Sequence, residues 1–298
     1  MSKIKIQFTL FSAFYSPLIL SMAGGFLKQE GLDFEWSVSP PGKPATDAIS
    51  NGTADVVQSA PSQAFNAIAR GETEYPRHFA QINEMDGFFI TGRAPDAEFS
   101  WKKLEGAEVV MFGGGQPNAM FRYACHRAGI DYDSIKAITP GGADDIDQAF
   151  RAGQGQYVQQ QGPYPQQLEQ DDVGSVVARV GPQIGPCAFS SLAASRAWLE
   201  TDTARAFTRA YAATRRFLNQ APAAEIAALQ QSWFPGVSPA ALETCISSYQ
   251  GLGCWTPHVE ITRPAFDVIL DIFEYTGDIT ERHPYEMVCA AAPVSDPA

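Results

Sequence analysis

Short strand and helix patterns alternate along the first half of the chain, and this alternation restricts the possible folds more than any other feature. Apolar and polar residues alternate over 4–8 and again over 32–36, which is the period of a half-buried strand. Residues 46–69 predict a helix ended by Asn51-Gly52, a strand over 55–58 and a helix begun by Pro61. The theme returns at 105–129 and 136–156, two further strand–turn–helix patterns. Such alternation is typical of α/β proteins with largely parallel sheets.

The run "FSAFYSPLILSMAGGFLKQEGLDFEW" has two interpretations. A basic start and the small residues at 21–23 are features of a cleavable leader. Polar residues interrupt the run, however, and Pro17 stands in its middle. Ser16 and Pro17 instead suit an N-cap and first turn, with Gly31 past the end of the helix. We favour the second interpretation, in which this segment is part of the mature fold.

The later segments give weaker patterns. Residues 79–92 predict an apolar strand broken by Asp86-Gly87. The glutamine-rich segment 153–170 predicts turns around a short helix. From about Ser190 the chain is alanine-rich and predicts helices broken only at Pro222, and residues 263–277 predict a closing amphipathic helix.

Length and charge exclude several classes of function. The 298 residues are enough for two lobes, each with its own core, and no apolar stretch is long enough to span a bilayer. The net charge of −12 argues against nucleic acid, which binds through lysine and arginine. It also argues against docking on an anionic membrane surface. The expected partner is therefore a small molecule, with no membrane insertion.

The cysteines and histidines do not form a recognisable catalytic or metal-binding pattern. The five cysteines are scattered without a CxxC pair, which favours buried thiols; a bond between Cys245 and Cys254 is the alternative in an exported protein. Cys125 and His126 are adjacent on a predicted helix and point about 100° apart, so they do not pair as nucleophile and base. The four histidines have no metal-ligand spacing. We expect no metal and no cofactor.

Two short motifs are candidates for ligand binding. "FGGGQPN" lacks both the third glycine of a dinucleotide loop and the GK[ST] of a phosphate loop. Its glycines still expose backbone N–H groups before a helix, which suits a carboxylate or another small acceptor; a flexible turn is the alternative. Glu84 and Asp86 lie two apart on the interrupted strand. They are interpreted as a solvated pair or as acceptors for a ligand N–H or amine, and acid–base catalysis is less favoured.

Several further side chains are expected at strand ends, where ligands bind in open α/β sheets. Ser59 follows a predicted strand, where it either caps the next helix or faces a ligand. Phe14 and Tyr15 stand together at the first strand–helix turn, and Tyr164 lies in another predicted loop. Each aromatic side chain packs in a core or lines a cleft.

Taken together, the chain resembles the type 2 periplasmic binding fold. More narrowly, it resembles the nitrate, sulfonate, taurine and pyrimidine-precursor (SsuA-like) group of solute-binding proteins of ABC transporters. The resemblance rests on "YSPLILSMAGGFLKQEGLDFEW", "AISNGTADVVQSAPSQAFNAIARG", "GGGQPN", "QGPYPQQLEQ" and "FEYTGDI", which span nearly the whole chain. It implies two α/β lobes with two mixed sheets flanked by helices, a hinge, and a ligand held in the cleft between the lobes.

The resemblance also implies boundaries and contacts. Lobe one would comprise residues 1–86 and 189–298, and lobe two residues 87–188. The chain would cross near residues 86–88 and 185–189. The ligand contacts that it implies are Phe14, Tyr15, Ser16, Gly42, Lys43, Ser59, Ala60, Gly114, Gly115, Gln116, Pro117 and the segment from Gln161 to Tyr164.

Two departures from the family pattern shape the functional hypothesis. The family-like "wEPy" pattern is "QGPY" here, and Lys43 is the only basic residue in these loops. A sulfonate or nitrate site needs charge-assisted donors, so a flat aromatic or heteroaromatic ligand with polar edges is favoured. The chain also shows no leader, which favours the cytoplasm; a periplasmic protein whose leader was removed is the alternative. The main hypothesis is a solute-binding protein for uptake or sensing, with a transporter permease or a regulatory protein as partner. A cytosolic enzyme on the same fold is the alternative.

Overall fold

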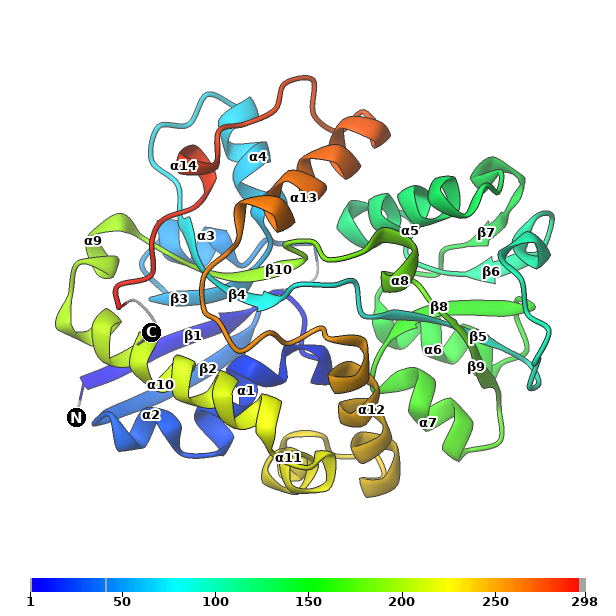
Figure 1. The fold of residues 1–298 in the computed structure, drawn as a ribbon, viewed down its shortest axis with the longest axis horizontal. Helices are drawn as coiled ribbons and strands as arrows, with labels where there is room; N and C mark the ends of the chain where they lie inside the picture. Colours follow the sequence, from blue (N-terminus) through cyan, green and yellow to red (C-terminus); the bar gives the residue numbers. More distant parts are fainter. Residues whose placement is uncertain (1, 41, 295–298) are drawn as a thin grey trace.

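The computed structural model describes residues 2–40 and 42–294, and its strands form two five-stranded sheets (Figure 1). In the first sheet, the strand order is β2-β1-β3-β10-β4. Its strands are β1 (Ser2–Phe8), β2 (Leu32–Val38), β3 (Val56–Ser59), β4 (Arg77–Asn83) and β10 (Ser190–Ala194). In the second, the order is β7-β6-β8-β5-β9. Its strands are β5 (Phe88–Gly92), β6 (Glu108–Val110), β7 (Lys136–Ile138), β8 (Tyr157–Gln161) and β9 (Ser175–Arg179).

Both sheets are mixed. β1 runs parallel to β2 and β3, and β6 runs parallel to β7 and β8. β10 is antiparallel to β3 and β4, and β5 is antiparallel to β8 and β9. The predicted α/β fold with two mixed sheets is confirmed, whereas the expectation of largely parallel sheets is wrong. The antiparallel strands are those that follow the passages of the chain from one sheet to the other.

Two segments form strands that the sequence did not predict. Residues 190–194, expected to begin a helical region, are β10 in the interior of the first sheet, where all five residues are buried. Residues 157–161, expected as turns, are β8 at the centre of the second sheet. Serine, alanine and glutamine carry weak strand propensity, so in both cases pairing on both sides outweighs local preference.

Helices cover both sides of the first sheet (Figure 1). One group packs together next to β2: α1 (Ser16–Ala23), α2 (Phe26–Gln29), α10 (Asp202–Gln220) and α11 (Ala223–Gln230). The other group lies near β3, β4 and β10: α3 (Thr46–Ser50), α4 (Pro61–Ala69), α13 (Arg263–Thr276) and α14 (Tyr285–Val288). The short α9 (Arg196–Leu199) packs against α10.

The second sheet separates two packed layers. Val109 of β6 belongs to the large core together with α5 (Gly115–Ala128), which contacts α8 (Gly181–Ile184). The next residue, Val110, belongs to a smaller cluster with α6 (Ala143–Arg151) and α7 (Tyr164–Gln170). This follows from the two-residue period of a strand, which sends neighbouring side chains to opposite faces. We call the elements around the first sheet, together with α11 and α12 (Pro239–Leu252), the first half of the molecule, and the elements around the second sheet the second half. α12 packs against α7. The 3₁₀ turns are η1 (Ala13–Tyr15), η2 (Trp101–Leu104), η3 (Tyr132–Ser134) and η4 (Gln231–Trp233).

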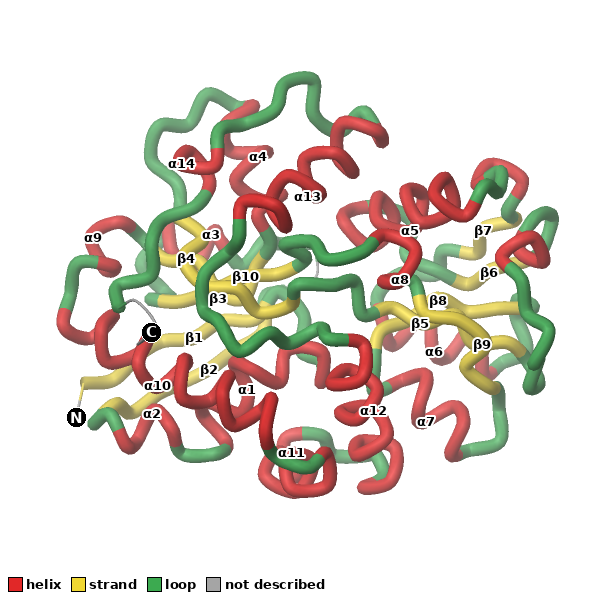
Figure 2. The backbone as a smooth tube through the Cα atoms, viewed as in Figure 1, coloured by secondary structure: helices red, strands yellow, loops and turns green. Residues whose placement is uncertain are grey.

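Two crossings join the sheets and lie next to each other (Figure 2). The chain leaves the first sheet between β4 and β5 and returns between α8 and β10. The Cys187 N–H donates to the Glu84 carbonyl (2.9 Å), and the Phe189 N–H donates to the Asn83 carbonyl (3.1 Å). The Glu84 N–H donates to the Cys254 carbonyl (2.9 Å), so a third segment joins them. The outgoing and returning segments are therefore hydrogen-bonded to each other at the hinge.

The opening segment folds as strand, turn and helix, with two corrections. β1 is buried on one face, and α1 contributes Leu18 and Met22 to the core. Ser16 is the first residue of α1, not its N-cap: the cap is Tyr15, without a side-chain hydrogen bond. Ser12 caps the preceding turn η1 instead, accepting from the Phe14 N–H (3.1 Å). The expected single helix is also split, because Gly25 adopts a left-handed conformation (φ 78°) between α1 and α2.

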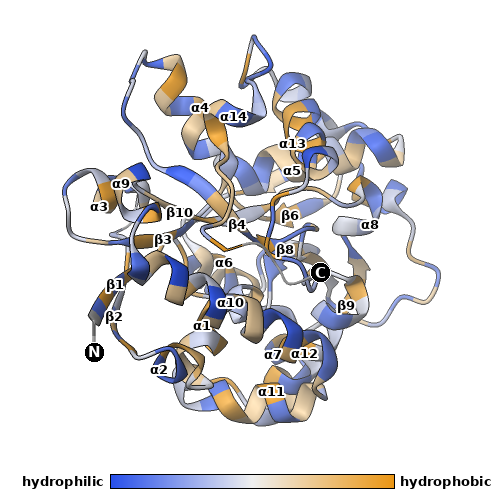
Figure 3. Cartoon of the chain, turned by 60° about the vertical axis from the view of Figure 1, so that its left-hand side comes forward, coloured by the Kyte–Doolittle hydropathy of each residue, from blue (hydrophilic) through white to orange (hydrophobic). Residues whose placement is uncertain are grey.

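Burial follows the hydropathy of each helix, with apolar and polar positions alternating around helices such as α4 and α13 (Figure 3). All five cysteines are buried free thiols, so the alternative bond between Cys245 and Cys254 is not formed. Among the described residues no helix is long and apolar enough to cross a membrane. Cys125 is a buried thiol and His126 is exposed. The His126 ring stacks on Tyr275, with ring centroids 4.4 Å apart.

Candidate functional site

A cavity of about 780 Å³ lies where strands of both sheets end. From the first sheet it is lined by residues that follow β1 and β2, by α3, and by α4 from Gln63 to its C-cap Arg70. From the second sheet come Gly115, at the start of α5, and Gly142 and Asp144, at the start of α6. Both parts of the chain therefore form its walls, at the carboxyl ends of β1, β2, β6 and β7, where ligands bind in open α/β sheets.

A second cavity of about 340 Å³ lies beside the first, and Asp144 lines both. The smaller cavity is lined from the first half by Phe11, Trp233 and Phe234. From the second half, its walls are Asp144, Asp147, Arg151, Pro163, Tyr164 and Gln167. We call the two cavities the larger and the smaller compartment of the cleft.

Of the sequence-predicted residues, Gly42, Lys43 and Gly115 line the larger compartment and Tyr164 lines the smaller. The Tyr164 hydroxyl donates to Asp144 Oδ1, so the start of α7 is tied to the start of α6. Burial and the neighbouring Asp144 carboxylate both raise the pKa of Tyr164, which therefore stays a neutral hydrogen-bond donor. Gly114 is extended and exposed, with open space around its α-carbon.

Phe14 and Tyr15 lie behind these walls and are buried. The Phe14 ring packs against Phe189 and Tyr249, with centroids 5.2 and 4.9 Å apart. The Tyr15 hydroxyl interacts with the Gln161 side chain, and burial raises its pKa far above the usual range. A side chain of the first strand–helix turn thus meets the end of β8 in the second sheet. Ser16 is also fully buried, and its hydroxyl pairs with Gln230 (3.1 Å) inside the first half.

Three buried polar atoms among the predicted residues have no hydrogen-bond partner of good geometry: Ser59 Oγ, Asp86 Oδ2 and Gln161 Nε2. Ser59 does not cap α4, whose N-cap is Ala60. Leaving a buried donor or acceptor unpaired costs about 1–3 kcal/mol. Ser59, Asp86 and Gln161 are buried, and none of them lines either compartment of the cleft.

Gln116 connects the two halves directly. Its Oε1 accepts from the Ser62 hydroxyl of α4 (2.7 Å), and its Nε2 donates to the Phe189 carbonyl (2.5 Å). Ser12 makes a similar bridge by donating to the Gly162 carbonyl (2.6 Å). Both bridges join the first sheet's elements to the second's, so they hold the halves close together.

Asp86 lies at the hinge and is fully buried. Its Oδ1 accepts from the Phe88 N–H (2.7 Å) and closes a tight turn at the crossing. Burial raises its pKa from 3.8 to about 7, against the smaller opposing effect of that hydrogen bond. The thiols of Cys187 and Cys254 and the Tyr15 hydroxyl are its titratable neighbours. Near neutral pH, Asp86 is thus poised between its two protonation states.

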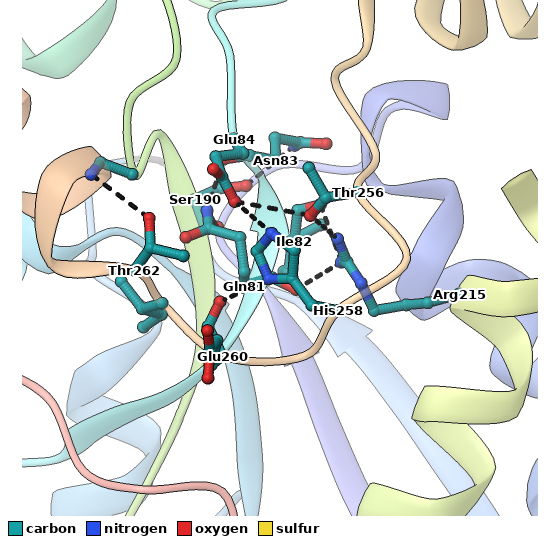
Figure 4. A network of polar contacts seen from close by, with 12 residues as sticks. Gln81, Ile82, Asn83, Glu84, Ser190, Arg215, Thr256, His258, Glu260 and Thr262 are labelled. Carbon is teal, nitrogen blue, oxygen red and sulfur yellow. Dashed lines mark hydrogen bonds and ion pairs between the residues drawn. The ribbon is translucent and has the colours of Figure 1, made fainter. Parts of the chain in front are cut away.

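Glu84 belongs to a polar network with Arg215, Thr256 and His258 (Figure 4). Its Oε2 is 2.9 Å from His258 Nε2, and this hydrogen bond raises the pKa of His258. Next to it, the buried Arg215 donates to the Gln81 carbonyl (2.5 Å) and to Thr256 Oγ1 (2.8 Å). Glu84 and His258 line a separate hollow that contains neither Asp86 nor the cleft residues. The two carboxyl groups do not form one site.

Some residues in and behind the cleft could not be found from the sequence. Tyr249, a buried residue of α12, accepts from the Gly162 N–H (2.6 Å) and donates to the Gly87 carbonyl (3.2 Å). Trp233 stacks on Trp36 (5.1 Å), and Trp36 stacks on Phe11 (4.9 Å). Phe11 carried a signal, since it belongs to the same turn as Phe14. Nothing local in sequence links Trp233 to that turn.

The fold and the position of the cleft define the class of protein. A ligand-binding component of an ABC-type import system from Staphylococcus aureus, solved with zinc bound, superposes with a TM-score of 0.77 over 98% of each chain, at 13% identity. The periplasmic aliphatic sulphonate binding protein SsuA from Escherichia coli gives 0.73 over 97% of each chain, at 14% identity. This chain therefore has the periplasmic-binding-protein fold, as its sequence motifs predicted.

The family follows from the sequence itself. The model of the NMT1-like family matches residues 3–231, and the chain belongs to this family. A Bacillus subtilis (strain 168) protein named "Putative binding protein YtlA" is 27% identical over 293 residues, which cover 97% of this chain and 87% of that protein.

Proposed function

We propose that the protein binds a small aromatic or heteroaromatic solute between its two halves and delivers it to an ABC-type importer. The observation that carries this proposal is the chemistry of the cleft. Its smaller compartment is lined by the aromatic side chains of Phe11, Trp233 and Tyr164. Its larger compartment is lined in part by the neutral polar side chains of Ser39, Gln63 and Asn66. Flat rings with polar edges fit such walls, because ring faces pack on aromatic side chains while ring nitrogens and amines pair with hydroxyls and amides.

The charges around the cleft support a ligand that is not a strong anion. Of the basic residues in the larger compartment, Arg70 is paired with Glu72 (2.7 Å), and Asp47 and Asp144 add negative charge. Lys43 is the basic residue left for a ligand. The sulfonate-binding function described for the E. coli protein is therefore not carried over to this chain.

Hinge closure is the proposed mode of action. Residues 1–86 and 189–298 would form one lobe and 87–188 the other; Met1, Pro41 and 295–298 lie outside the described residues. The contacts of Gln116 with Ser62 and Phe189 and of Ser12 with Gly162 would break on opening and form again on closing. Ligand occupancy would thus change the shape that a permease contacts.

In this role the protein would contact the importer on the outer side of the membrane, which is also where the name "periplasmic" places the E. coli protein. The five free cysteines are compatible with the periplasm and with the cytoplasm alike. Burial raises the pKa of each thiol and protects it from oxidation. Cell fractionation of the natural gene product is the direct measurement.

Native mass spectra of freshly purified protein, beside denatured spectra of the same sample, test the main proposal. We expect a discrete excess mass that disappears on denaturation and belongs to an aromatic compound. A thermal-shift panel then compares aromatic heterocycles with taurine and alkylsulfonates. Tighter binding of the sulfonates would refute the proposed ligand class, and turnover of a bound aromatic would refute a purely binding role.

A further inference from the structure

The smaller compartment of the cleft has a composition that selects a particular kind of chemical group. Its wall from the first half is aromatic, formed by Phe11, Trp233 and Phe234. Its opposite wall carries two carboxylates, Asp144 and Asp147. We propose that this compartment binds a positively charged organic nitrogen, an ammonium or quaternary ammonium group, on the ligand. This inference rests on the proposed function and narrows its ligand class.

The aromatic wall is held in place before any ligand arrives. Phe11 packs against Phe234 with centroids 5.1 Å apart and lies nearly parallel to Trp233, at an interplanar angle of 17°. Trp36 is stacked on both Phe11 and Trp233 and supports them from β2. An organic cation is attracted to the negative face of such rings, and recognition of quaternary ammonium groups by aromatic side chains is a common use of this effect.

The charges of the opposite wall do not cancel. Arg151 donates from Nε to Asp147 Oδ2 (2.6 Å) and from a terminal nitrogen to Asp171 Oδ2 (2.8 Å). One guanidinium is therefore shared by two carboxylates, and Asp144 adds a third. The Tyr164 hydroxyl, which donates to Asp144, carries no charge to neutralise it. The wall keeps an excess of negative charge next to the aromatic rings.

One carboxylate oxygen is unpaired. Asp147 Oδ1 is buried and accepts no hydrogen bond, while the side chain as a whole is 13% exposed. A buried carboxylate oxygen without a donor is unfavourable by an amount comparable to a lost charged hydrogen bond, and a cation in the compartment would relieve it. With its volume of about 340 Å³, the compartment can hold an ammonium group with its substituents, while Asp144 connects it to the larger compartment.

Choline and its uncharged analogue 3,3-dimethylbutan-1-ol test the inference, since they share a shape and differ in charge. Binding is followed on the indole N–H signals of the five tryptophans, with Trp233 assigned through Trp233→Phe. We expect choline to shift the Trp233 signal and to bind at least about tenfold more tightly than the alcohol, in keeping with a cation–π contact plus a partly buried carboxylate. Equal affinities, or no Trp233 shift with choline, would overturn the inference.

Variants locate the charge that matters. Asp144→Asn keeps the acceptor for Tyr164 and should weaken choline binding about fivefold without changing the alcohol, while Asp144→Glu should restore most of the preference. Glu98→Gln is the matched control, because Glu98 is an exposed acid of the same half outside the cleft. Choline binding that is unaffected by Asp144→Asn, or equally affected by Glu98→Gln, would refute the site.

The cation compartment and the proposed aromatic ligand class can be refuted independently of each other. Uncharged heteroaromatic solutes that bind in the cleft while choline does not reach Trp233 would refute the cation compartment alone. Choline binding that depends on Asp144, together with a co-purified mass that is not aromatic, would support the compartment and refute the proposed aromatic ligand class.

Discussion

The hinge residue Gly87 offers the sharpest test of how the core is packed between the two sheets. A β-carbon at this position would lie 2.5 Å from Phe14 Cδ2 and 2.6 Å from Cζ, and closer still to Cε2. Carbon atoms in contact are about 3.5–4.0 Å apart, so the Phe14 ring would have to move by more than about 1 Å. Phe14 is fully buried and enclosed by Tyr15, Phe189 and Tyr249. A shift of the ring would therefore have to displace these buried neighbours as well.

We therefore expect Gly87→Ala to destabilise the protein. Overpacking of a core typically costs about 1–3 kcal/mol. Restricting the unfolded chain by replacing glycine with alanine returns about 0.4–1 kcal/mol, because Gly87 does not adopt a left-handed conformation. The net loss of about 1–2 kcal/mol should lower Tm by roughly 2–6 °C for a chain of this size. Urea denaturation and calorimetry measure both quantities.

Gly251→Ala is the matched control. Gly251 lies in α12, and a β-carbon added there would meet no atom within 4 Å. Alanine is favoured over glycine in a helix by up to about 1 kcal/mol, so this variant should be more stable than the natural protein. Phe14→Leu combined with Gly87→Ala should lose less stability than the sum of the two single changes, since leucine leaves room for the new methyl group. A Gly87→Ala protein as stable as the natural one would refute this packing of Phe14.

Three further predictions concern titration and reactivity. Because the pKa of Asp86 is raised, the native state keeps the proton on this carboxyl between pH 3.8 and about 7, whereas the unfolded state loses it. The free energy of unfolding should therefore fall as pH rises through this window, by at most about 4 kcal/mol. In urea denaturation at pH 5 and 8, Asp86→Asn should remove most of this pH dependence. The pKa of His258 is raised, so its pairing with Glu84 should stabilise the fold below pH 6.5, and this effect should be lost as pH rises through the folded pKa. Because the pair is partly exposed, a double-mutant cycle with His258→Gln and Glu84→Gln should give a coupling energy under about 1 kcal/mol, and none at high pH. All five thiols should resist a disulfide reagent until the protein unfolds, and fast labelling of Cys187 or Cys254 in the native state would contradict their burial in the hinge.

Local sequence signals predicted most elements in the N-terminal half of the chain correctly, because turn residues and residue periodicity near each element determine it. Asn51-Gly52 and Pro61 placed the boundaries of α3 and α4 to within a residue or two, since a turn glycine and a first-turn proline act on the backbone itself. Leu32, Phe34 and Trp36 predicted β2 from their period alone. β10 was missed for the opposite reason: Ser190 to Ala194 become a strand only because β3 and β4 pair with them on both sides.

The site divides in the same way. The glycine-rich turn at Gly115 and the predicted loop at Tyr164 could be expected in a cleft from the sequence pattern, whereas Gly42 and Lys43 were expected only through the family resemblance. Which side chains become walls and which become supports depends on contacts between distant segments. Phe14 lies behind the cleft wall, where it packs against Tyr249 and Phe189. Glu84 lies outside the cleft, where it pairs with His258.

The packing of the hinge also limits how the halves can move. One continuous core contains residues of both sheets, including Phe14, Phe88, Phe189 and Tyr249. A motion that separated these rings would expose them and the carboxyl group of Asp86 to water. Opening is therefore expected to leave this cluster intact and to break the contacts on the cleft side, those of Ser12 with Gly162 and of Gln116 with Ser62. The buried hinge would then act as the fixed axis, with the cleft opening away from it.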